Sequence, residues 1–189
     1  MNDILLATQS EGKDLLMQKL KISRIDFELA FGLNSQETTA YLDTETGEVV
    51  IVENYAVDQL EELLTNEETL DDIQATLKAQ PGLTEIEREQ LMDAARVEGD
   101  MANLYRMLPQ QYSRDGYRDM QEYIEALEDD HLRELLEVAI QGSGAFRRFK
   151  DVLYRFPDAQ GNWFKFREER EQRRRLDWLN SEGIEPEFE

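Results

Sequence analysis

Apolar residues recur at helical spacing through most of the second half of this 189-residue chain. From residue 113 to residue 156 they lie three or four positions apart, and the pattern stops at Gly142-Ser143-Gly144 and at Pro157. Such spacing puts apolar side chains on one face of each helix, which must be buried against another element. The pattern therefore predicts a helical core over residues 113–184. The residues that carry it are Tyr117, Met120, Ile124 and Leu127, then Leu132, Leu135, Leu136, Ala139 and Ile140, then Phe146, Phe149, Leu153 and Phe156.

A β-hairpin is predicted over residues 38–52. Two apolar strand-like runs flank the loop 43–48, in which Gly47 supplies the positive φ that such a loop needs. Residues 104–109 read as a further short extended segment. A two-stranded hairpin is marginal alone, so helices must cover it. The expected fold is α+β and mostly α, with one small hairpin packed against about seven helices.

The remaining segments also read as helices. We expect an N-terminal helical extension over residues 1–22, with a short helix at 13–20, followed by a single α+β domain over residues 23–189. Residues 57–98 are predicted to form an acidic helical insertion, in which Thr84 and Glu87 make a capping box. Asn162 is expected to cap the last helix, which runs towards Asn180.

The net charge of −21 lies entirely in residues 1–140, because residues 141–189 hold 10 basic and 10 acidic residues. A chain of this charge is repelled as a whole by nucleic acids and by anionic membranes, so any phosphate contact must be local. The acidic surface has two readings: a solvated face, or a docking face for a basic partner. The sequence shows neither a signal peptide at Met1-Asn2-Asp3 nor an apolar stretch of about 20 residues, so we expect a cytoplasmic protein with no membrane contact.

Several segments together resemble a known group of proteins. The most distinctive is Gly-Ala-Phe-Arg-Arg-Phe-Lys-Asp at residues 144–151, and weaker similarities occur at residues 41–50, 117–120, 163–166 and 176–179. In these segments the chain resembles the bacterial Uncharacterised Protein Family 0158, over most of residues 24–184. The resemblance implies one unit with a hairpin and several helices in a bacterial cytoplasm. It implies no activity, cofactor or catalytic residue.

The residues that catalysis usually needs are scarce. The chain has no cysteine and a single histidine, His131. Asp129, Asp130 and Glu134 lie near that histidine, but acidic residues at a helix N-terminus are expected from the helix dipole. No glycine-rich phosphate loop and no metalloprotease motif occurs. We predict no catalytic residue, no metal and no cofactor, and keep a metal- or acid-dependent hydrolase near His131 as an alternative.

The surface of residues 143–179 is the strongest candidate for binding. Residues 143–175 carry 10 basic and 5 acidic residues with interleaved aromatic residues. One reading is that these basic residues pair with the acidic half of the same chain, so that residues 57–98 cover them. If they are free, a protein partner is the leading functional interpretation, and a nucleic-acid or phosphate-binding regulator is the alternative, although not one that binds generic duplex DNA. The oligomeric state stays open. The candidate binding residues are Gly142, Ser143, Gly144, Arg147, Arg148, Lys150, Trp163, Lys165 and Arg167.

Two parts of this surface have more specific readings. Gly142-Ser143-Gly144 precedes a helix that carries Arg147 and Arg148, which suits either a phosphate or a tight helix–helix turn. Residues 167–175 contain no apolar residue and span about 13 Å of helix. Because such a stretch buries little by itself, we expect it to bridge solvent or to dock on opposite charge.

Overall fold

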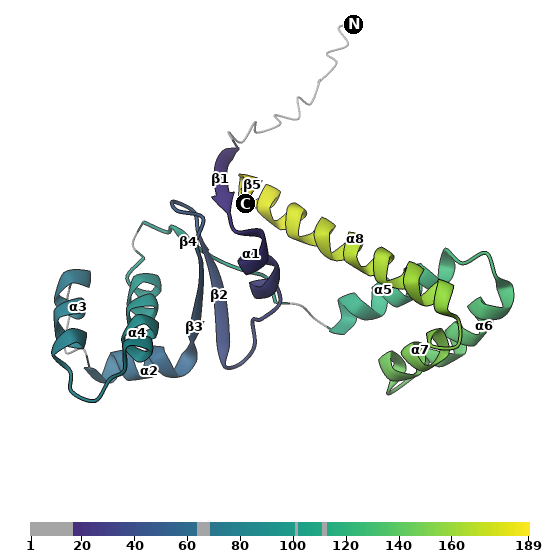
Figure 1. The fold of residues 1–189 in the computed structure, drawn as a ribbon, viewed down its shortest axis with the longest axis horizontal. Helices are drawn as coiled ribbons and strands as arrows, with labels where there is room; N and C mark the ends of the chain where they lie inside the picture. The colour runs from purple at the N-terminus through teal and green to yellow at the C-terminus, as the bar shows by residue number, and fades with distance from the viewer. Residues whose placement is uncertain (1–16, 64–68, 101, 111–112) are drawn as a thin grey trace, which may run out of the picture.

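The computed structural model of the chain describes residues 17–63, 69–100, 102–110 and 113–189. The described residues form an elongated molecule with a small sheet near its middle and a helical group at each end (Figure 1). The predicted class, α+β and mostly α, is confirmed. The strands are β1 (Gln18–Ile22), β2 (Thr38–Asp43), β3 (Val49–Glu53), β4 (Tyr105–Met107) and β5 (Ile184–Phe188). The helices are α1 (Arg24–Ala30), α2 (Asn54–Leu63), α3 (Leu70–Ala79), α4 (Glu85–Glu98), α5 (Ser113–Glu125), α6 (Asp130–Ala139), α7 (Ala145–Leu153) and α8 (Pro157–Ser181).

The predicted hairpin is confirmed as β2 and β3, which pair antiparallel with Thr38 opposite Glu53. The extended segment expected near residue 105 is β4, which pairs antiparallel with the other side of β2. The sheet therefore has three strands in the order β3-β2-β4. A third strand and a helical layer give this sheet the support that a lone hairpin lacks.

The helix predicted over residues 13–20 is wrong where the structure describes it, and its earlier part lies outside the described residues. Gln18–Ile22 is the strand β1, which pairs parallel with β5 near the other end of the chain. The reason is the alternation of the segment, since Leu20 and Ile22 are buried whereas Lys19 and Lys21 are exposed. A period of two residues belongs to a half-buried strand rather than to a helix.

The helices expected in the acidic stretch 57–98 are α2, α3 and α4. Their apolar faces pack against Val50 and Val52 of β3, so this layer is part of the sheet's core. The Thr84–Glu87 capping box is present, and the hydrogen bonds from the Thr84 backbone and hydroxyl lower the pKa of Glu87. This acidic layer and the α5–α8 bundle occupy opposite ends of the molecule (Figure 1), so the layer does not cover residues 143–179.

Helix α8 connects the bundle to the centre of the molecule. It begins at Pro157, five residues before the predicted cap at Asn162. Proline fits the first turn of a helix, because the backbone N–H that it lacks would have no acceptor within the helix there. Trp163 near its start belongs to the core of the bundle, whereas Leu179 near its end is buried beside α1 and the sheet. The charged stretch 167–175 lies between these two cores.

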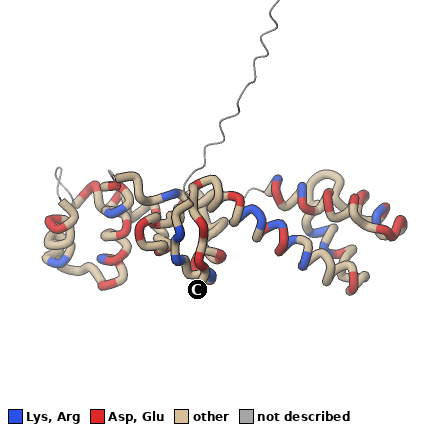
Figure 2. The backbone as a smooth tube through the Cα atoms, turned by 90° about the horizontal axis from the view of Figure 1, so that it is seen from above, with Lys and Arg blue, Asp and Glu red and all other residues tan. Residues whose placement is uncertain are grey.

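The charged stretch docks on acidic residues, which is one of the two alternatives that the sequence left open. Asp119 of α5 is buried and accepts two hydrogen bonds of 2.9 Å from the Arg174 guanidinium. Arg170 also pairs with Asp119, at 3.6 Å, and with Glu122. Burial alone would lower the pKa of Arg174, but the hydrogen bonds and charge of Asp119 raise it, so the guanidinium stays charged. In Figure 2 the basic run of α8 lies between the centre of the molecule and the helical bundle at one end.

Replacing Asp119 by Asn should destabilise the fold by about 2 kcal/mol, because the half-buried Arg174 guanidinium loses its charge-assisted, two-point partner. The free energy of unfolding from urea denaturation measures this loss. Asp177→Asn is the matched control, because Asp177 lines the same small cavity but is exposed. Equal midpoints for the two variants would show that the Asp119–Arg174 pair contributes nothing to stability.

Candidate interaction surface

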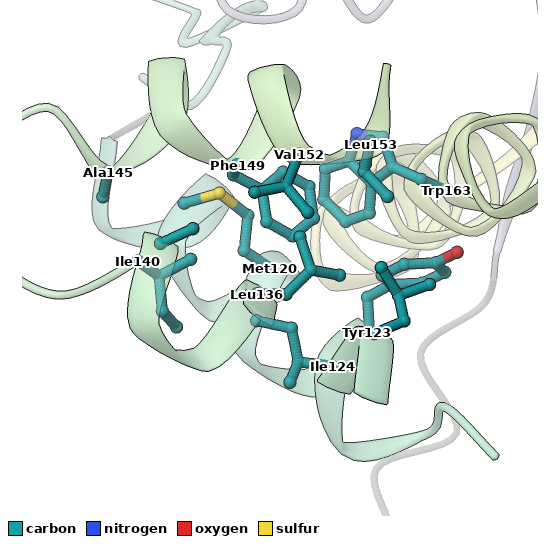
Figure 3. Packing of buried hydrophobic residues seen from close by; sticks show 12 residues of the cluster. Met120, Tyr123, Ile124, Leu136, Ile140, Ala145, Phe149, Val152, Leu153 and Trp163 are labelled. Carbon is teal, nitrogen blue, oxygen red and sulfur yellow. The ribbon is translucent and has the colours of Figure 1, made fainter. Parts of the chain in front are cut away.

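Helices α6 and α7 form an antiparallel hairpin whose inner side is the core of the bundle. Asp129 caps α6 by accepting a hydrogen bond of 3.0 Å from the Leu132 backbone N–H. From α7, the Phe149 ring packs edge to face against Trp163, with ring centroids 4.9 Å apart (Figure 3). Trp163 is 6% exposed, so this candidate binding residue is part of the core. Its side chain holds α8 against the hairpin.

Phe146 does not belong to the buried face of α7 on which its spacing placed it. Its side chain is 41% exposed, and its ring lies over Gly116 of α5. The buried face of α7 consists of Ala145, Phe149, Val152 and Leu153. The prediction for Phe146 is wrong because this short helix begins at Ala145, which takes the inward position at its first turn.

The turn between α6 and α7 is held by Arg148. Its guanidinium donates hydrogen bonds to the carbonyl oxygens of Ala139 at 2.9 Å, of Ser143 at 2.5 Å and of Gln141. Ala139 is the last residue of α6, and Gln141 and Ser143 follow it. Their carbonyl oxygens therefore have no next helical turn whose N–H groups could donate hydrogen bonds to them. The arrangement supports the reading of Gly142-Ser143-Gly144 as a helix–helix turn, because Arg148 is engaged with the backbone.

The other candidate residues lie on different faces of the bundle. Arg147 and Lys150 are exposed on α7. Lys165 lines a groove between α5 and α8, beside Tyr123 and Phe166. Arg167 pairs with Glu171 on α8 at 3.3 Å. The candidate residues of segment 143–179 therefore do not form one continuous binding surface.

One part of this surface is an open groove along the outer side of the α6–α7 hairpin. Its volume is about 510 Å³. Apolar side chains line its floor, and Val138 is 73% exposed. Charged side chains line its rim. The floor residues are Leu135, Val138, Ala139 and Val152, and the rim residues are Arg148, Asp151 and Arg155. We call this feature the α6–α7 groove.

Of the residues that line the α6–α7 groove, only Arg148 was a candidate from the sequence. The six that were missed are Leu135, Val138, Ala139, Asp151, Val152 and Arg155. A usable signal was the number of apolar residues on α6, since Leu132, Leu136 and Ala139 already fill its inner face. Leu135 and Val138 must then lie on a second face. Arg155 is exposed and, in the part of the chain that the structure describes, no acidic residue pairs with it.

Two other grooves of the described residues, between α3 and α4 and between α5 and α8, have less to offer a partner. The one between α3 and α4, of about 400 Å³, has its arginines engaged: Arg88 bonds the Leu77 carbonyl at 3.0 Å, and Arg96 bonds Asp93 at 3.0 Å. The α5–α8 groove has Glu128 and Glu169 beside its single lysine. The α6–α7 groove combines an exposed apolar floor with a free cation.

His131 is exposed at the first turn of α6. Within the described ranges, no three His, Asp or Glu residues gather closely enough to hold a metal ion. No described helix is long and apolar enough to cross a membrane.

Comparisons with known proteins agree with the resemblance seen in the sequence. The model of an uncharacterised protein family, UPF0158, matches residues 87–189, a range that contains the whole α6–α7 groove. A UPF0158 protein of Pseudomonas aeruginosa is 26% identical over 160 residues, which cover 84% of this chain and 82% of the relative. No solved structure matches. Since the family model covers more than half of the sequence, the chain belongs to UPF0158, a protein family whose function is uncharacterised.

Proposed function

We propose that the chain is a non-enzymatic cytoplasmic interaction protein that binds a protein partner in the α6–α7 groove. The observation that carries this proposal is an open apolar groove formed by two helices of the family-matched region, with Arg155 at its rim, which forms an ion pair with no described residue. The two helices are held rigidly, α6 by its Asp129 cap and the turn by Arg148. A preformed groove of this kind suits a helical segment of a partner, whose apolar residues fill the floor.

The exposure of Val138 supports the proposal. The Val138 side chain is 73% exposed, so its apolar surface is in contact with water. Covering this surface with a partner lowers the free energy of the complex. Single exposed apolar residues are common, but Val138 is continuous with the groove floor formed by Leu135 and Val152. An apolar centre with a polar rim is the usual composition of a protein–protein interface.

Affinity capture from the cells in which the protein occurs, with mass spectrometry of the bound proteins, tests this proposal. The bait variant is Val138→Glu, which places a charge on the groove floor at an exposed position that the fold tolerates. The matched control is Ile86→Glu on α4, because Ile86 is 70% exposed and lies in the acidic layer. We expect the wild type and the Ile86 variant to retain the same protein, and the Val138 variant to lose it. Equal recovery on all three baits would refute binding in this groove.

A second candidate function is binding of single-stranded nucleic acid by the exposed side of α7. Arg147, Lys150 and Tyr154 share a helix face at spacings of three and four, and Tyr154 is 79% exposed. Cations beside an exposed ring suit phosphates and a stacked base. Nuclease treatment of the captured material separates the two candidates, because only a nucleic-acid-dependent complex would be lost.

The protein should not bind generic duplex DNA measurably at physiological salt. Non-specific binding needs several cations that face the phosphates, because its free energy comes from the release of counterions. Here α7 and the turn after it offer Arg147, Lys150 and Arg155, while Arg148 is engaged and the whole chain carries −21. A mobility-shift assay with duplex and single-stranded probes at low and physiological salt measures this. Salt-dependent duplex binding that is lost in Arg147→Ala/Lys150→Ala would contradict the prediction and favour the second candidate.

A further inference from the structure

We infer that a small cavity between α5 and α8 binds a phosphate group, either inorganic phosphate or the phosphate of a small phosphomonoester, between the guanidinium groups of Arg118 and Arg173. The cavity has a volume of about 160 Å³, and four arginine and three aspartate side chains line it. It shares no residue with the α6–α7 groove, so the inference goes beyond the proposed function.

Two of the four arginines are neutralised by acids of α5. Asp119 accepts hydrogen bonds of 2.9 Å from both terminal nitrogens of Arg174 and pairs with Arg170 at 3.6 Å. Arg170 also pairs with Glu122. Two carboxylates thus balance two guanidinium groups, so this group of four residues adds no net charge to the cavity.

The other two arginines, Arg118 of α5 and Arg173 of α8, stand outside that group. Both are exposed, and neither forms a hydrogen bond or an ion pair with any residue that the structure describes. They lie at the same level of the two helices, because Asp119, next to Arg118, pairs with Arg170 and Arg174 on either side of Arg173. Two like charges that line one cavity repel each other, and an anion between them replaces that repulsion by two attractions.

The chemistry of the donors favours phosphate over a carboxylate. A guanidinium presents a planar fork of N–H groups that matches two oxygens of one phosphate, and a phosphate monoester has three acceptor oxygens, enough to bond two guanidinium groups at once. In addition, the buried Nε of Arg174 has no hydrogen-bond partner among the described residues, and such donors usually find an ordered water or an ion.

The size of the cavity limits the ligand to a small group. A water molecule takes about 30 Å³ of liquid, so about 160 Å³ holds one phosphate and a few waters. A sugar or a base attached to that phosphate would have to stay outside. The site therefore suits a single phosphate rather than a whole nucleotide.

Two aspartates of the cavity oppose any anion and keep the expected affinity low. Asp115 lies three residues before Arg118, and Asp177 lies four residues after Arg173, so each is one helical turn from a cation. Because their charges reduce the net attraction, we expect a dissociation constant of about 1 mM for inorganic phosphate.

An NMR titration of the full ¹⁵N-labelled chain with inorganic phosphate tests the inference. Sodium chloride keeps the ionic strength constant, so that general screening does not change. We expect saturable shifts of the amide signals around Arg118 and Arg173. Arg118→Gln and Arg173→Gln should each raise the dissociation constant about tenfold, because each removes one charged fork. Arg155→Gln is the matched control, an exposed arginine outside this cavity, and should bind phosphate like the wild type.

Asp177→Asn provides a test with the opposite sign. It removes a repelling charge from the cavity and leaves every arginine in place, so the dissociation constant should fall about threefold. Damage to the fold could only weaken binding, so tighter binding in this variant cannot arise from misfolding. Unchanged or weaker binding in Asp177→Asn would overturn the inference.

The remaining outcomes are equally definite. Shifts that do not saturate, or a dissociation constant that neither Arg118→Gln nor Arg173→Gln changes, would show that phosphate does not bind in this cavity. A parallel titration with glycerol 3-phosphate separates the two sources of the phosphate group. Similar affinity for both probes assigns the cavity to the phosphate of a small phosphomonoester, whereas binding of inorganic phosphate alone assigns it to the free ion.

Discussion

Gly47→Ala should lower the melting temperature by about 10 °C. Gly47 has φ +80°, a conformation that costs an alanine about 1–2 kcal/mol. In addition, a Cβ at Gly47 would lie 1.8 Å from the carbonyl oxygen of Lys21 in β1, so the β2–β3 loop or β1 must move. Adding about 1–3 kcal/mol for that displacement gives a loss of about 2–5 kcal/mol, and each kcal/mol lowers the melting temperature by about 2–4 °C at this chain length.

Gly82→Ala is the control for the steric part of this effect. Gly82 also has a positive φ, +92°, but nothing lies within 4 Å of a Cβ built there. Its substitution should cost only the backbone strain, about 1–2 kcal/mol. Thermal melts of the two variants followed by circular dichroism give the comparison. Equal shifts would show that the hairpin loop does not press on β1 in solution.

Phe149→Ala should cost about 3–5 kcal/mol of unfolding free energy, the range for emptying a large buried aromatic site. Phe149 is 1% exposed and packs against Tyr123 and Trp163 in the centre of the bundle (Figure 3). The cavity would lie where α5, α7 and α8 meet, so these helices cannot easily collapse into it.

Phe146→Ala provides the matched control for Phe149→Ala, because it removes the same ring three residues earlier on the same helix. Phe146 is 41% exposed, so we expect a loss of about 1 kcal/mol or less. Urea denaturation of both variants measures the two free energies. A loss at Phe146 as large as that at Phe149 would mean that the Phe146 ring is buried, as its sequence spacing suggested.

Local sequence patterns predicted the parts of the fold that local interactions determine. The hairpin around Gly47, the capping box of Thr84 and Glu87 and the cap at Asp129 all involve residues within a few positions of one another. The docking of residues 167–175 on opposite charge was also predictable, because a helical stretch without apolar residues stabilises the fold only through its charges.

The pairing of β1 with β5 was not predictable in the same way. Gln18 and Ile184 are partners, and nothing in either segment identifies the other. Leu20 and Ile22 alternate with lysines, which is the pattern of a half-buried strand, but the pattern is short. Leu15, Leu16 and Leu20 together favoured a helix instead. A parallel pair also has no turn to mark it, in contrast to a hairpin.

The predicted surface and the α6–α7 groove overlap only in part. The α7 side of the groove lies within residues 143–179, but Arg148 and Trp163 of that range have structural roles. On α6, Leu135 was predicted as core and Val138 was assigned to no face. The reason is that the boundary between the buried and exposed faces of a short helix depends on which neighbour covers it, and periodicity alone does not contain that information.

Site-specific photo-crosslinking at Val138 tests the central claim most directly. A photoreactive phenylalanine analogue at this exposed position reacts only with what lies on the groove in the cell. We predict one discrete crosslinked protein product from position 138, weakened by Arg155→Glu and absent from the same label at Ile86. A product that contains only this chain identifies a second copy of the chain as the partner. Absence of any product at position 138, or the same products at both positions, would contradict the account of the α6–α7 groove as an interaction surface.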